Sequence, residues 1–169
     1  MLKTTPASSL PHALRHSDYP NTHIAKIQVS LDGPDHLVTL EWAGPHAQEG
    51  EVGPFVSSPG AGVRGHGCDD VAASQRSGSK CTPKGMHLVE GFTPHLNDNP
   101  QAVHVTWFNR ARAIGFHFFP EVPPYAASHG CVRLKSDHAA RLIYDNAVAG
   151  ITEVTVEGTW TKPPHQWPA

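Results

Sequence analysis

Apolar and β-branched residues recur at about every second position in two stretches near the start of the chain, residues 23–31 and 36–42. This period is typical of a β-strand with one buried face, and Asp32-Gly33 between the stretches is a turn signal. A third strand-like run covers residues 51–57. The first part of the chain therefore predicts short strands joined by turns.

Further strand-like runs lie beyond a Gly- and Ser-rich stretch. They cover residues 85–90, 102–108 and 112–118, and Asn109-Arg110 marks a hairpin turn between the last two. Another short strand is predicted over residues 152–156. These runs extend the β pattern to the end of the chain.

One helix is predicted, over residues 136–149. Ser136 is a favourable N-cap, Asp137 suits the first helical turn, and Gly150 is placed for the C-cap. One face of this helix is apolar, with Leu142, Ile143 and Ala147. The sequence therefore predicts a mostly β fold with one main α-helix.

Composition limits the size of the protein and its partners. A chain of 169 residues suits one domain, and 16 prolines with 15 glycines favour short strands and turns over a helical bundle. The net charge of −2 gives no electrostatic footprint for nucleic acid. No run approaches the roughly 18 apolar residues of a membrane helix, so no membrane span is expected.

The two ends of the chain lack the strand and helix periods. Residues 1–22 are rich in Ser, Pro and His and are interpreted as an N-terminal tail or arm. Residues 159–169 contain paired prolines and two tryptophans and are interpreted as a C-terminal tail on the surface. The expected domain covers residues 23–158.

The segment Ser-His-Gly-Cys-Val-Arg-Leu, residues 128–134, contains the cysteine with the clearest chemical context. Cys131 follows a glycine and precedes Arg133 by two positions, while His117 lies in an alternating strand-like stretch upstream. A histidine facing a cysteine is the minimum apparatus of thiolate catalysis, in which the imidazolium holds the pKa of the thiol down. The structural alternatives are a buried thiol and a histidine hydrogen-bonded inside the sheet.

This segment, together with His117, resembles the active-site signature of the L,D-transpeptidases, the YkuD-type cysteine enzymes that cross-link peptidoglycan. Other landmarks of that family occur in the same order, over roughly residues 23–157. They are Val29-Ser30-Leu31, residues 53–60, Cys81-Thr82-Pro83-Lys84-Gly85, the predicted helix with Gly150, and residues 152–156. The resemblance implies a β-sandwich or barrel-like catalytic domain, peptidoglycan peptide stems as substrates, and no cofactor or metal.

The resemblance also suggests roles for the residues around the cysteine. The backbone amides of Gly130 and Cys131 are candidates for an oxyanion hole, while Ser128 and His129 shape the turn. Arg133 either binds a carboxylate of the peptide stem or forms a structural salt bridge. In the family a backbone carbonyl or a serine orients the histidine. A carbonyl is expected here, because the bulky Phe118 follows His117.

The segment between His117 and Ser128 is short, aromatic and Pro-rich where the family often has glycine. We expect it to wall the substrate groove through Phe119 and Tyr125. Several acceptors stay open, namely the amines of a 3-3 or a 1-3 cross-link, water, or a free D-amino acid in a carboxypeptidase, exchange enzyme or wall-attacking effector. The alternative from a different class is a non-catalytic wall-binding or zinc-stabilised module.

Cys68 and Cys81 lie in one Gly/Ser-rich insert, and their pairing would leave Cys131 as the odd thiol. We expect a disulfide there. The alternatives are two reduced thiols or a zinc cluster with His66 and His87, whose spacing is not that of a standard knuckle.

The resemblance implies a periplasmic or cell-envelope enzyme. The first residues contain one lysine but no apolar core of a signal peptide, so the chain as given is not expected to carry a secretory signal. The export route and the oligomeric state stay open.

Overall fold

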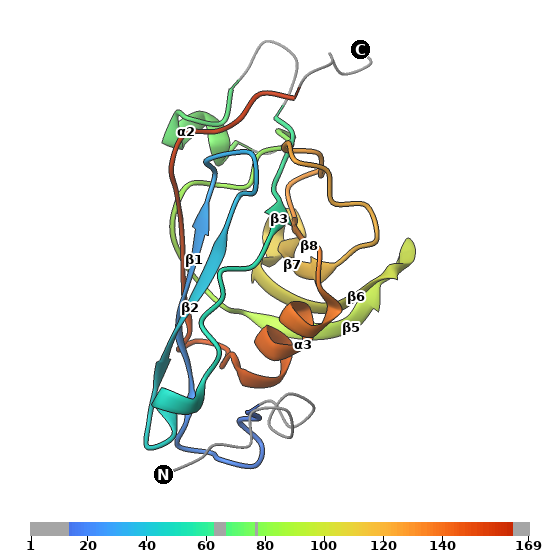
Figure 1. The fold of residues 1–169 in the computed structure, drawn as a ribbon. Coiled ribbons are helices and arrows are strands. Elements are labelled where there is room, and N and C mark those ends of the chain that lie inside the picture. Colours follow the sequence, from blue (N-terminus) through green and yellow to red (C-terminus); the bar gives the residue numbers. More distant parts are fainter. Residues whose placement is uncertain (1–13, 63–66, 77, 164–169) are drawn as a thin grey trace.

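The computed structural model describes residues 14–62, 67–76 and 78–163, which form two mixed β-sheets with one main helix (Figure 1). The first sheet has the order β2 (Val38–Ala43), β1 (His23–Ser30), β9 (Glu153–Glu157) and β4 (Gly85–Leu88). The second has the order β3 (Ser57–Ser58), β8 (Val132–Leu134), β7 (Ile114–Phe118), β6 (Asn99–Asn109) and β5 (Gly91–Leu96). The prediction of a mostly β fold with one main helix is confirmed.

The core lies between the two sheets. Alternate residues of β1, Ile27 and Val29, are fully buried, as the period of two requires. On the second sheet Phe116 of β7 and Val132 of β8 are paired neighbours and face the same core. The apolar residues that alternate along these strands therefore form the inner faces of both sheets.

The main helix, α3 (Asp137–Asn146), packs between the sheets, because it contacts β6 and β7 of one and β1 of the other. Ser136 is its N-cap as predicted, with the side chain accepting a hydrogen bond from the Ala139 N–H at 3.2 Å. The predicted C-terminus is wrong. The helix ends at Asn146, and Gly150 instead turns the chain before β9 with φ +80°.

Other parts of the fold differ from the sequence prediction. The run 51–57 contributes only Ser57, the first residue of β3 (Ser57–Ser58), and an isolated bridge from Phe55 to Val38. Strands β5 and β8, the short helix α2 (Val71–Ser74) and two 3-10 turns, Ala47–Glu49 and Arg110–Arg112, were not predicted. Strand β6 begins at Asn99, earlier than expected, so β5 and β6 form a long hairpin that projects from the sheet in Figure 1.

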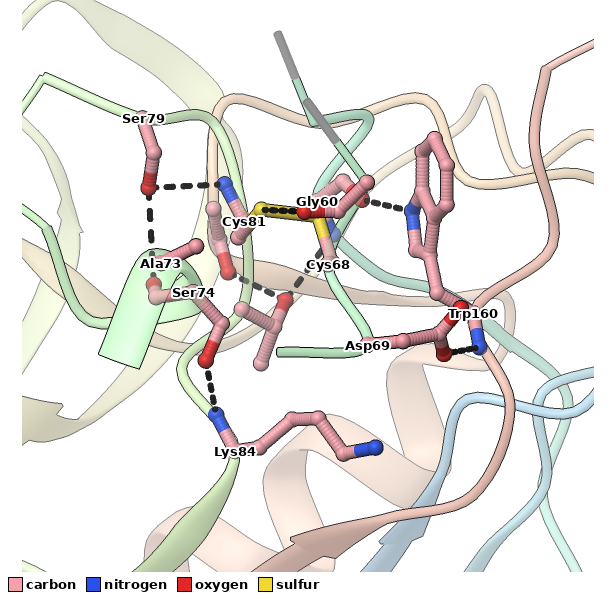
Figure 2. Close-up of a disulfide and its surroundings, with 12 residues drawn as sticks. Gly60, Cys68, Asp69, Ala73, Ser74, Ser79, Cys81, Lys84 and Trp160 are labelled. Carbon is pink, nitrogen blue, oxygen red and sulfur yellow. Dashed lines mark hydrogen bonds between the residues drawn. A yellow bond between two sulfur atoms is a disulfide. The ribbon is translucent and has the colours of Figure 1, made fainter. Parts of the chain in front are cut away.

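The described parts of both predicted tails contact the domain. Asn146 of α3 donates a hydrogen bond to the Leu14 carbonyl, and Arg15 pairs with Asp145 at 3.7 Å. At the other end the Trp160 indole donates to the Gly60 carbonyl at 3.1 Å (Figure 2). The domain boundaries at residues 23 and 158 stay a prediction.

Candidate active site

Parallel pairing of β7 with β8 brings His117 and Cys131 to one face of the second sheet. His117 is paired with Arg133, so the two side chains point to the same side of the sheet. Cys131 lies two positions before Arg133, so the alternation along β8 places its side chain on that face as well. Cys131 and His117 both line one groove there. The register therefore assembles the two residues that the sequence singled out.

His117 is held in one tautomer. Its Nδ1 lies 2.8 Å from the Phe118 carbonyl oxygen, which can only accept, so Nδ1 has the proton and Nε2 has the lone pair. The side chain is nearly fully buried, and its ring meets that of Phe119 edge to face. Burial lowers the pKa of His117, which favours the neutral imidazole, and the nearby Arg133 acts in the same direction.

The surroundings of the Cys131 thiol disfavour its thiolate form. The thiol donates to the Ala113 carbonyl at 3.4 Å, and burial raises its pKa to about 11, although the Gly115 N–H and Arg133 act to lower it. This direction is opposite to the one expected from the sequence, a thiol pKa held down by an imidazolium. Burial opposes the charge on each group and therefore favours a neutral thiol and a neutral imidazole.

Residues Ser128–Cys131, here called the catalytic turn, are tied together by one hydroxyl. Ser128 Oγ donates to the Cys131 carbonyl and accepts from the Gly130 N–H at 3.0 Å. Gly130 has φ +136°, a backbone conformation that disfavours other residues. The Gly130 N–H is thus already bonded, contrary to the expected oxyanion role. The Cys131 N–H is the remaining candidate from that pair.

A groove of about 600 Å³ opens over this face. It is lined by Cys131, His117, Phe119, Ser128, His129 and Arg133, and by residues of the β5–β6 hairpin. Tyr125 is not among the lining residues, which differs from the expectation, and its carbonyl instead accepts from Ser58 Oγ. The hairpin wall, which includes Thr93, Asp98 and Trp107, was missed because β5 has no clear period of two.

Arg133 forms no ion pair with any residue in the described part of the chain. Its guanidinium lies 4.6 Å from the centre of the Phe119 ring and donates to the Glu121 carbonyl at 3.3 Å. A salt bridge, one of the two roles expected from the sequence, is therefore not observed. The guanidinium remains able to bind a carboxylate in the groove.

Cys68 and Cys81 are joined by a disulfide (Figure 2). A bonded pair offers no thiolates to zinc, and His87 bonds the Pro83 carbonyl through Nε2. His66 lies outside the described residues. Over residues 14–62, 67–76 and 78–163 no group of three or more His, Cys, Asp or Glu residues is placed to bind a metal ion.

Comparisons with known proteins identify the family of the chain. The family model of the YkuD L,D-transpeptidase catalytic domain matches residues 42–156, and the chain belongs to this family. A search of curated protein sequences finds no significant match. Enzymes of the family act on peptidoglycan of the cell wall. Within the described residues, no helix is long and apolar enough to cross a membrane.

Solved structures share the fold at low sequence identity. The L,D-transpeptidase of Xylanimonas cellulosilytica is 18% identical with a TM-score of 0.51, and the alignment covers 92% of this chain and 71% of that one. The L,D-transpeptidase of Stackebrandtia nassauensis is 19% identical with a TM-score of 0.50, over 83% of this chain and 57% of that one. The chain thus spans only part of the length of these structures.

Proposed function

We propose that this chain is a cysteine-dependent L,D-transpeptidase that transfers an acyl group from a peptidoglycan tetrapeptide stem to an amine. The observation that supports this most strongly is that Cys131 and His117 line one groove, with His117 Nε2 free to accept a proton. No cofactor enters the proposed reaction.

The first half-reaction forms a thioester. His117 Nε2 takes the thiol proton as Cys131 Sγ attacks the carbonyl of the third stem residue, and the Cys131 N–H donates to the resulting oxyanion. The C–N bond to the terminal D-alanine then breaks, and His117 returns the proton to the leaving amine. D-Alanine departs and the peptide stays on sulfur.

The second half-reaction passes the acyl group on. An acceptor amine attacks the thioester carbonyl and gives a proton to His117, and the C–S bond then breaks as the proton returns to sulfur. The groove suits an anionic peptide, because Arg110, Arg112 and Arg133 line it against one acidic residue, Asp98. The cationic lining favours the free carboxylates of a stem peptide.

The test is incubation with disaccharide tetrapeptide, followed by mass spectrometry of the products, with Cys131→Ser as the matched control. Cross-linked dimer and released D-alanine from the unmodified protein alone would support the proposal, and fragmentation would distinguish 3-3 from 1-3 links. A tripeptide product would instead identify water as the acceptor, and an exchange product would identify a D-amino acid. Turnover by Cys131→Ser would contradict the mechanism.

A further inference from the structure

Thr82 follows the disulfide-bonded Cys81 directly and is buried beneath the catalytic turn. Its Oγ1 donates to the Gly130 carbonyl at 2.6 Å and accepts from the Gly60 N–H at 2.8 Å. One hydroxyl thus binds two segments that lie far apart in the sequence. Both bonds are well within hydrogen-bond range, and neither group is exposed to water, so each would lose a partner if the hydroxyl were removed.

We propose that Thr82 is a positioning residue that orients the Gly130–Cys131 peptide for catalysis, and that the Cys68–Cys81 disulfide holds Thr82 in place. This inference rests on the proposed function. Its physical basis is the planarity of the peptide bond, which joins the Gly130 C=O rigidly to the Cys131 N–H. Fixing the carbonyl on Thr82 therefore aims that N–H, the proposed oxyanion donor, away from Thr82.

The second bond of Thr82 secures the start of the catalytic turn. Gly60 forms a parallel bridge with Ser128, and the next residue, Ala61, donates its N–H to the Ser128 carbonyl at 2.9 Å. The contact with Thr82 is tight, because a Cβ at Gly60 would lie 2.6 Å from the Thr82 nitrogen. The hydroxyl of Thr82 therefore bonds Gly130 directly and, through Gly60, also holds Ser128 at the start of the turn.

The segment that carries Thr82 is itself anchored on two sides. The disulfide ties Cys81 to Cys68 (Figure 2), and the Arg112 guanidinium donates to the Cys81 carbonyl at 3.3 Å and to the Ser79 carbonyl at 2.9 Å. Arg112 directly precedes Ala113, whose carbonyl accepts from the Cys131 thiol. The segment around Cys81 therefore contacts Gly130, the residue before Cys131, through Thr82, and it also contacts Arg112, the residue before the hydrogen-bond partner of the thiol.

The experiment compares Thr82→Val, which removes the hydroxyl at similar volume, with Thr82→Ser, which keeps it. Thr106→Val is the matched control, since Thr106 is fully buried and its hydroxyl has no partner among the described residues. We expect Thr82→Val to lower kcat by about 10- to 100-fold with KM within about twofold, the scale of a misplaced catalytic group. Thr82→Ser and Thr106→Val should retain most of the wild-type kcat.

A folded Thr82→Val protein with wild-type kcat, or a Thr82→Ser protein that loses as much as Thr82→Val, would overturn the inference. If Thr82→Val does not fold, the decisive measurement is kcat of the wild-type protein after reduction of the disulfide with a phosphine. A fall in kcat that reoxidation reverses would support the proposal, and an unchanged kcat would overturn it. Absence of turnover in the untreated wild type would instead reject the proposed function.

Discussion

The resting state of Cys131 can be tested by the pH dependence of its alkylation. Burial raises its pKa from the ordinary 9.0 to about 11. At pH 7.5 this upward shift of two units lowers the thiolate fraction by about 100-fold, while the higher basicity makes each thiolate about 6- to 10-fold more nucleophilic. We therefore expect alkylation at pH 7.5 to be about 10-fold slower than that of an ordinary exposed thiol.

The assay is modification by iodoacetamide without reductant, read by mass spectrometry of the peptide containing Cys131. A matched reference thiol is Val52→Cys in a Cys131→Ala background, because the Val52 side chain is 54% exposed. The rate for Cys131 should still be rising at pH 10, where the reference has levelled off. Faster modification of Cys131 than of the reference below pH 7 would show a preformed thiolate–imidazolium pair and refute the reasoning.

The burial of His117 determines the pH range in which turnover is lost on the acid side. The pKa of His117 is lowered from 6.5, first by burial, and the reacting form needs the neutral imidazole. The midpoint of the acid limb should therefore lie below pH 6.5, and activity should be lost as the pH falls through it. A midpoint of kcat/KM at or above pH 6.5 would contradict this assignment.

Three further predictions concern single parts of the structure. His117→Ala should lower kcat/KM by about 10²- to 10⁴-fold in steady-state assays, and a smaller loss would argue against its role as base. Replacing Cys68 and Cys81 by Ala should reduce the free energy of unfolding by about 3 kcal/mol for a closed loop with a sequence separation of 13, measured by denaturant titration; an unchanged midpoint would show that the bond adds no stability. Phe119→Ala should speed acylation by a carbapenem in intact-mass time courses, whereas Tyr125→Ala should not, because only Phe119 lines the groove.

The sequence predicted the parts of the fold that have a regular period. β1, β2, β7 and β9 have one face in the core, and their alternation is visible in the residues. Ser136 was predicted as an N-cap because capping depends on local chemistry that the neighbouring residues show. Strand β5 contains Pro94 and is only partly buried, so its pairing with β6 leaves no such pattern.

The sequence predicted the two central residues of the site better than the residues and interactions around them. Cys131 and His117 stand out by residue type, but the direction of the thiol pKa depends on burial by segments distant in sequence. The bond between Ser128 and the Gly130 N–H likewise arises only when the turn is formed. Thr82 was noted only as part of a family landmark, because its two partners lie 22 and 48 residues away.

The most direct test of the central claim is intact-mass spectrometry of the protein mixed with a tetrapeptide donor and no acceptor, quenched in acid within one turnover. The account predicts a mass increase equal to the donor minus D-alanine, located on Cys131 by peptide mapping and absent from Cys131→Ala. Release of D-alanine with no adduct on Cys131 at any quench time, or an adduct that persists in Cys131→Ala, would contradict it.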